Sequence, residues 1–173
     1  MNSCDNFIFR ITIVHENSIT GLQAVGVLKR LAKRLATKLG LDISPWQFYT
    51  RAWKFDWLQN PELWEAAVAM SAEADMIIIS TGGHSALPAT VRCWIESVLP
   101  RRQRRPMALV ALLDDRGEAS LAALPPARYL RQLARRYGVG FFCNLNDQSK
   151  QIELGIDSLL FRFDQGLQKA ALN

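Results

Sequence analysis

Apolar residues follow two different spacings along this chain, and the two spacings alternate from the first residues to the last. Short runs of β-branched and aromatic residues are typical of strands; they fall at 7–14, 43–49, 76–79, 107–113 and 141–145. Between them apolar residues recur every three or four positions, as on one helix face; these stretches are 22–39, 61–70, 89–99, 125–137 and, less regularly, 154–167. Strands that alternate with helices in this way indicate a parallel sheet with helices on both faces.

The composition of the strands indicates where each lies in the sheet. The runs 76–79 and 107–113 are apolar at every position, which is typical of central strands covered on both faces. Pro45 interrupts the run 43–49 and favours an edge strand, because proline cannot donate to the ladder. Residues 51–60 are aromatic-rich without a clear period, so we expect a connection there. The sequence therefore predicts one domain over residues 1–173, an α/β fold: a three-layer α/β/α sandwich with a five-stranded parallel sheet.

The predicted helices carry terminal signals. Asn60 before Pro61 is a plausible N-cap, and Pro125-Pro126 open a helix that Gly138 ends. In the long first helix, Leu22, Val25, Leu28 and Leu31 have the spacing of an inward face.

Length and composition favour an ordinary globular protein. A chain of 173 residues buries about 70% of its unfolded-chain surface. No apolar run approaches the ~20 residues of a membrane helix, and the N-terminus lacks a basic region followed by an apolar core. The cysteines Cys4, Cys93 and Cys143 are odd in number and far apart, without disulfide or metal spacing. We therefore expect a cytoplasmic protein with reduced thiols and no membrane contact.

The net charge of +5 gathers in short basic runs, namely 29–30, 33–34, 101–105 and 135–136. On the predicted helices these side chains fall opposite the apolar stripe, which is typical of a solvated face. A nucleic-acid site usually adds interleaved exposed aromatics or a recognition helix, and neither is evident. The sequence therefore predicts no nucleic-acid partner.

The loop after the strand 76–79 is the first candidate binding site. Thr81, Gly82 and Gly83 follow that strand and His84 comes next. In an open α/β sheet, ligands lie at the carboxyl ends of the strands, and glycines let backbone amides approach a ligand closely. His84 is the side chain there that can stack, donate or titrate near neutral pH. The alternative, in which the glycines only make the turn and His84 is exposed, stays open.

The loop after the first strand is the second candidate site. Asn17, Ser18, Thr20 and Gly21 stand where the first helix begins. Hydroxyls and backbone amides at a helix N-terminus form an anion site, although the carboxylate of Glu16 would repel an anion there. The alternative is plain helix capping, which stabilises by about 1 kcal/mol.

The sequence contains few residues that could bind a metal ion. With His15 and His84 as the two histidines, and no ligand spacing around them, we expect no metal site. Four tryptophans gather between residues 46 and 64. Packing in the core accounts for most of them, and an exposed subset would suit a dimer face or a lid.

Three segments resemble the NAD(P)H-dependent FMN reductases, a branch of the flavodoxin-like fold. Residues 75–80 (DMIIIS) are similar to that family's strand ADAIIIS, and 87–92 (LPATVR) to its IPGALK, which opens the next helix. Residues 130–138 (LRQLARRYG) are similar to its LRxxLxxLG helix. The likeness covers most of residues 7–145. It implies a flavodoxin-like fold and a homodimer.

The same resemblance implies FMN as cofactor and NAD(P)H with a small-molecule substrate as partners. The flavin phosphate would lie at Asn17, Ser18, Thr20 and Gly21, and its ring against Thr81, Gly82, Gly83 and His84. Asp114, at the start of a third loop 114–120, suits a ribityl hydroxyl, or else a solvated turn. Because the flavin carries the hydride chemistry, such an oxidoreductase needs no catalytic side chain.

The candidate loops depart from the family pattern. The reductase phosphate loop Gly-Ser-x-Arg-x-x-Ser has no counterpart at 15–21. Those residues are closer to the flavodoxin pattern (S/T)-x-T-G-x-T, with Gln23 in place of its last threonine. The ring loop lacks the family's tyrosine and asparagine. A second hypothesis follows, a flavodoxin-like domain that holds no flavin and acts by binding a partner or a small anion.

Overall fold

The computed structural model describes residues 8–39, 48–102, 106–114 and 123–143. The helix expected between 154 and 167 and most of the loop 114–120 lie outside these residues. Within the described part, strands and helices alternate along the chain as the sequence predicts. The strands are β1 (Phe9–His15), β2 (Phe48–Lys54), β3 (Met76–Thr81), β4 (Ala108–Leu113) and β5 (Gly140–Cys143). The helices are α1 (Ser18–Leu39), the 3₁₀ helix η2 (Phe55–Gln59), α2 (Pro61–Ser71), α3 (Ala89–Arg101) and α4 (Pro125–Tyr137).

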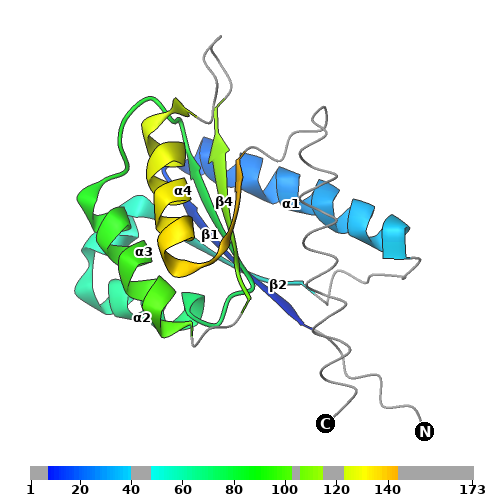
Figure 1. The fold of residues 1–173 in the computed structure, drawn as a ribbon, viewed down its shortest axis with the longest axis horizontal. Coiled ribbons are helices and arrows are strands. Elements are labelled where there is room, and N and C mark those ends of the chain that lie inside the picture. The colour runs from blue at the N-terminus through cyan, green and yellow to red at the C-terminus, as the bar shows by residue number, and fades with distance from the viewer. Residues whose placement is uncertain (1–7, 40–47, 103–105, 115–122, 144–173) are drawn as a thin grey trace, which may run out of the picture.

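The five strands form one parallel sheet in the order β2-β1-β3-β4-β5. This is the flavodoxin-like order of doubly wound α/β proteins. Helices α2, α3 and α4 lie on one side of the sheet and α1 on the other (Figure 1). The predicted three-layer α/β/α sandwich and its five-stranded parallel sheet are thus confirmed.

The hydrophobic core lies on both faces of the two central strands. Every residue of β3 and β4 is buried, as their unbroken apolar runs predict. Alternate residues point to opposite faces, so Ile78 and Val110 pack under α1, whereas Ile77 and Leu109 pack under α3 and α4. Burying each such side chain stabilises the fold by about 1.5–3 kcal/mol, which makes this pair of strands its rigid centre.

The position of the second strand differs from the prediction. It was expected at 43–49, but β2 runs from Phe48 to Lys54 and occupies the stretch expected to be a connection. Its register pairs Phe9 with Phe48 and His15 with Lys54. β2 lies at the sheet edge, as predicted. Because only part of each face is covered there, apolar and polar residues alternate only weakly in its sequence.

The inward face of α1 also differs from the prediction. The helix begins at Ser18, before Leu22, and the side chains of Leu22 and Val25 are 74% and 37% exposed. Among the described side chains of α1, the buried ones are Thr20, Ala24, Val27, Leu28 and Leu31. The helix is therefore rotated so that the small Ala24 faces the sheet, which lets α1 lie close to β1 and β3 and leaves the first apolar turn in solvent.

The predicted helix ends are confirmed. The Asn60 side chain accepts hydrogen bonds from the amides of Glu62 (3.0 Å) and Leu63 (3.4 Å) at the start of α2, the geometry of an N-cap. Helix α4 opens with prolines and ends at Gly138, whose φ of 63° is the left-handed conformation of a glycine C-cap. Within the described residues, no helix is long and apolar enough to cross a membrane.

A hydrogen bond from the Tyr129 hydroxyl to Glu96 (2.7 Å) joins α4 to α3. Burial, and then this bond to a carboxylate, raises the pKa of Tyr129 well above its ordinary value of 10.0. The folded protein therefore keeps the phenol proton at a pH where the unfolded chain has lost it.

A change of pH should reveal this contact. The stabilisation is fully present below pH 10, the ordinary pKa of tyrosine, and decreases above it, because only the unfolded chain then ionises. We expect Tyr129→Phe to flatten the fall in unfolding free energy between neutral and strongly alkaline pH, measured by urea titration. Burial also raises the pKa of Cys143, but that contribution is common to both proteins. Equal slopes in the two proteins would contradict the assignment.

Candidate functional site at the carboxyl edge of the sheet

The crevice expected in this fold lies between the ends of β1 and β3. These neighbouring strands continue into helices on opposite faces, and ligands of open α/β sheets bind at such a switch point. The loops that follow β1 and β3 contain most of the predicted site residues. The structure therefore brings the two candidate loops together, as the sequence predicts for parallel strands.

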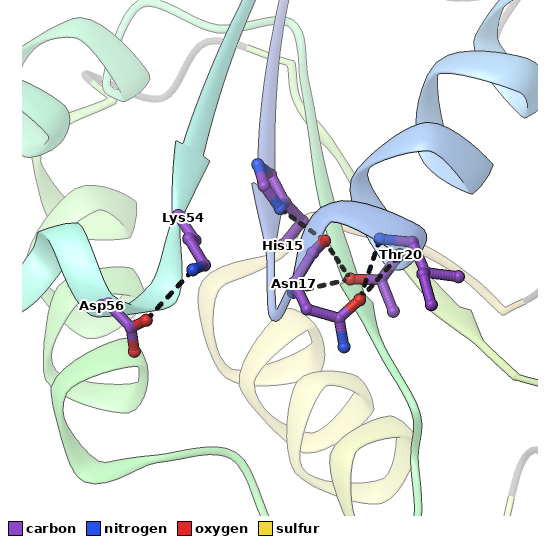
Figure 2. Close-up of polar contacts among 6 residues, drawn as sticks. His15, Asn17, Thr20, Lys54 and Asp56 are labelled. Atoms are coloured by element: carbon purple, nitrogen blue, oxygen red, sulfur yellow. Dashed lines mark hydrogen bonds and ion pairs between the residues drawn. The ribbon is translucent and has the colours of Figure 1, made fainter.

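Asn17 caps the N-terminus of α1. Its Oδ1 accepts hydrogen bonds from the amides of Ile19 (3.0 Å) and Thr20 (3.1 Å), and its backbone carbonyl accepts from the amide of Gly21 (3.0 Å). The Thr20 hydroxyl adds two more hydrogen bonds to Asn17 (Figure 2). It donates to the Asn17 carbonyl at 2.9 Å and accepts from the Asn17 amide at 3.0 Å. The amides that would hold an anion are thus bonded within the loop, which is the capping geometry that the sequence left as an alternative.

His15 lies on the outer side of the same turn. Its Nδ1 is 2.9 Å from the carbonyl oxygen of Asn17. A carbonyl only accepts, so Nδ1 is the donor of this hydrogen bond. A Cβ placed on Gly21 would be 3.0 Å from the His15 ring, so Gly21 is needed for the packing of this ring. Next to it, Lys54 at the end of β2 pairs with Asp56 at 3.4 Å (Figure 2).

Glu16 joins the loops that follow β1 and β3. Its Oε2 accepts hydrogen bonds from the Thr81 hydroxyl at 2.7 Å and from the Gly82 amide at 2.8 Å. Its amide donates to the Ser80 carbonyl at 3.0 Å. The Ser80 hydroxyl in turn donates to the Thr20 carbonyl at 2.8 Å. The loops after β1 and β3 are therefore tied together by side chains from both.

This role of Glu16 was missed in the sequence. The sequence indicates Glu16 only as a carboxylate that repels an anion, because its partners Thr81 and Gly82 are more than 60 positions away in the chain. The signal that could have found it is the register of parallel strands, which aligns the residue after β1 with the residues after β3.

The glycine turn after β3 is held in one conformation. Gly83 is buried with φ of 83°, and a Cβ there would lie 3.2 Å from Leu124 and 3.3 Å from Leu113. His84 is exposed, which agrees with the alternative of a structural turn. Ser18 is also exposed at the start of α1. Of the predicted ring-contact residues, Thr81 is buried and the Gly82 amide is already bonded to Glu16.

Among the described residues, the charged side chains at this edge are mostly negative. Asp114 follows β4 and is partly exposed, and the rest of its loop lies outside the described residues. Together with Glu16 and Asp56 it places carboxylates near the strand ends, where Lys54 is the cation paired with one of them. In the described residues, no three His, Cys, Asp or Glu side chains are grouped so that they could hold a metal ion.

The flavodoxin-like fold implies FMN, and the residues present do not fit its phosphate. A bound phosphate needs free amides at the N-terminus of α1, and those of Ile19, Thr20 and Gly21 are bonded to Asn17. The Glu16 carboxylate occupies donors of the other loop and adds a negative charge.

Comparison with known proteins leaves the family open. No family model matches the chain, and no curated protein matches it. Among solved structures it is similar to a cysteine-to-alanine mutant of flavodoxin from Pseudomonas aeruginosa, with 13% sequence identity and a TM-score of 0.42. That alignment covers 92% of this chain and 99% of the flavodoxin chain. The strand order, and not this modest similarity, is the basis for the flavodoxin-like fold described above.

Proposed function

We propose that this chain is a flavodoxin-like domain that holds no flavin and acts by binding a protein partner. The observation that supports the proposal most strongly is the bridge from Glu16 to Thr81 and Gly82. It crosses the switch point at which a nucleotide-like ligand would lie and uses donors that such a ligand requires.

The energetics of opening the crevice favour this proposal. A flavin phosphate would have to displace Asn17 from the amides of α1 and Glu16 from the other loop. Each hydrogen bond contributes about 1 kcal/mol, and a bond to a charged group about 1.5–3 kcal/mol. A small anion meets the same obstacle because it needs the same amides, so a protein partner is the better candidate.

Exposed apolar side chains support partner binding. Apart from Ile8, the exposed large hydrophobic side chains lie on two parts of the described surface. One group lies on α1 and the other on β2, η2 and α2; their members are Ile19, Leu22 and Val25, and Tyr49, Trp57, Leu63 and Met70. Exposed apolar groups of this kind often mark contact surfaces.

The second candidate is an FMN-dependent oxidoreductase that NAD(P)H reduces. It is favoured by the strand order, which in other proteins places FMN at the same switch point. In that case Gly82 and Gly83 would border the ring, and the flavin would supply the hydride chemistry. Glu16 and Asn17 would have to leave their present hydrogen bonds.

Titration with FMN tests the proposal. We expect the wild-type protein to be purified colourless, to leave FMN fluorescence unquenched and to show no thermal shift up to about 1 mM FMN, a concentration at which binding free energies of ~4 kcal/mol or more become detectable. The matched variant Glu16→Gln keeps the size of the side chain and removes its charge. Binding only by the variant would identify the carboxylate as the excluding group. Saturable quenching with a thermal shift in the wild-type protein would overturn the proposal in favour of the oxidoreductase.

A further inference from the structure

We propose that an acidic segment of a partner protein binds to the outer face of α4. We call this face the α4 basic surface and define it by Arg128, Arg131, Arg135 and Arg136. The inference rests on the proposed function, which is the binding of a protein partner. It adds a surface that the exposed apolar groups do not include, and it assigns the chemistry of the segment that binds there.

Helix α4 contains four arginines and no acidic residue. Arg128, Arg131 and Arg135 have the spacing i, i+3, i+7, which makes them neighbours along one helix face. Like charges at this spacing destabilise a helix, and Arg128 also places a cation close to the N-terminus, where the helix dipole opposes it. The free protein therefore keeps these arginines at a cost in stability. Residues that break a local rule in this way are expected at functional sites.

The charges of the α4 basic surface are not neutralised by carboxylates in the described part of the chain. Arg128, Arg135 and Arg136 are exposed, and no described carboxylate is paired with any of them. On the neighbouring helix α3, the Glu96 carboxylate instead accepts a hydrogen bond from the Tyr129 hydroxyl. An acidic segment would supply the carboxylates that the fold does not.

Two guanidinium groups of this surface are held over aromatic rings. The Arg131 guanidinium lies 5.5 Å from the centroid of the Phe141 ring, and the Arg136 guanidinium lies 5.6 Å from the centroid of the Tyr137 ring. A ring contacts the face of a guanidinium, whereas a carboxylate binds its edge, so one group can make both contacts. Side chains that are already oriented lose less conformational entropy when a partner binds.

The same surface suits a membrane or a single-stranded nucleic acid less well. Leu130 and Leu133 of α4 are buried in the core, so they cannot insert into a lipid interface. Single-stranded nucleic acids bind by stacking their bases on aromatic rings, and here arginines lie over the rings of Tyr137 and Phe141. Carboxylates need only the guanidinium edges. The observations therefore favour an acidic protein segment.

Binding of an acidic peptide tests the proposal. The probe is a fluorescein-labelled helical peptide with glutamates at the spacing i, i+3, i+7, and a second peptide carries glutamines in their place. In fluorescence anisotropy at low salt we expect saturable binding of the glutamate peptide to the wild-type protein, and binding of the glutamine peptide that is at least about tenfold weaker. Arg128→Glu/Arg135→Glu should weaken binding of the glutamate peptide at least about tenfold, because it places like charges opposite one another.

The matched control is Lys29→Glu/Lys33→Glu on α1. It makes the same change in net charge at two exposed positions of a helix on the other side of the sheet (Figure 1). It should retain most of the wild-type affinity. The difference between the two double variants separates the α4 basic surface from the net charge of the whole protein.

Stability distinguishes a binding role from a structural one. Arg128→Glu removes the like-charge pair with Arg131 and places an anion near the N-terminus of α4. The denaturation midpoint in urea should therefore rise while peptide binding weakens. A midpoint that falls would show that Arg128 serves the fold and would overturn the assignment.

Each result of the binding experiment decides the matter. Loss of binding in Arg128→Glu/Arg135→Glu but not in the α1 control supports the proposal. Equal loss in both variants overturns it, and so does a wild-type protein that leaves the glutamate peptide unbound at about 1 mM. Tighter binding to a DNA duplex or to phosphatidylserine vesicles, dependent on the same two arginines, would overturn it in favour of that partner. The FMN titration does not involve α4, so failure of the proposed function and failure of this inference can be told apart.

Discussion

Replacing Trp94 by alanine is expected to lower the free energy of unfolding by about 3–5 kcal/mol, because it leaves a cavity the size of an indole. Trp94 is fully buried in α3 and belongs to the core cluster under that face of the sheet. Since domains are commonly stable by only about 5–15 kcal/mol, this single change should remove a large part of the total. Urea denaturation followed by far-UV circular dichroism measures it.

The phenylalanine variant separates packing from polarity. The indole Nε1 of Trp94 is buried and has no hydrogen-bond partner among the described residues. A buried donor without a partner costs about 1–3 kcal/mol, and phenylalanine removes it while it fills most of the volume. Trp94→Phe should therefore cost much less than Trp94→Ala. Equal losses in the two variants would show that this side chain is not packed as described.

Gly83→Ala is expected to cost about 2 kcal/mol or more, for two separate reasons. Its φ of 83° is a conformation that costs an L-residue about 1–2 kcal/mol. In addition, a new Cβ would lie 3.2–3.3 Å from the side chains of Leu124 and Leu113. The loss of stability should appear as a lower denaturation midpoint in urea.

Gly138→Ala is the matched control for this change. Gly138 also has a positive φ, of 63°, but no atom lies within 4 Å of the added Cβ. Gly138→Ala should therefore show the conformational cost alone, about 1–2 kcal/mol. If the two variants lost the same stability, the glycine turn after β3 would not be held by close contacts with its neighbours.

The layers of the fold were predictable because they depend on local patterns. The unbroken apolar runs of β3 and β4 encode burial on both faces, and Asn60 and Gly138 encode helix ends through their own backbone preferences. The predicted position of β2 was wrong because an edge strand whose faces are only half covered shows little alternation of apolar and polar residues. The predicted inward face of α1 was wrong because the small Ala24, and not Leu22, faces the sheet and sets how closely the helix packs against it.

The candidate site was predictable in position but not in its contacts. Strand order places the loops after β1 and β3 side by side, and that part follows from the pattern alone. Whether an amide faces a ligand or a side chain depends on partners far away in the chain. Asn17 and Thr20 are joined by hydrogen bonds that a similarity between loop sequences does not reveal. Glu16 reaches Gly82, 66 positions away.

The central claim is that the Glu16 carboxylate joins the loops after β1 and β3, and the amide resonance of Gly82 reports on it directly. In ¹⁵N–¹H spectra, removal of that carboxylate should move this resonance, because a hydrogen bond to a charged acceptor is shorter and stronger than one to a neutral acceptor. The amide of Gly138, which donates to backbone carbonyls, serves as the internal control. We predict that the Gly82 resonance moves between the wild-type protein and Glu16→Gln, whereas the Gly138 resonance stays fixed. A Gly82 resonance at the same position in both proteins would contradict the account.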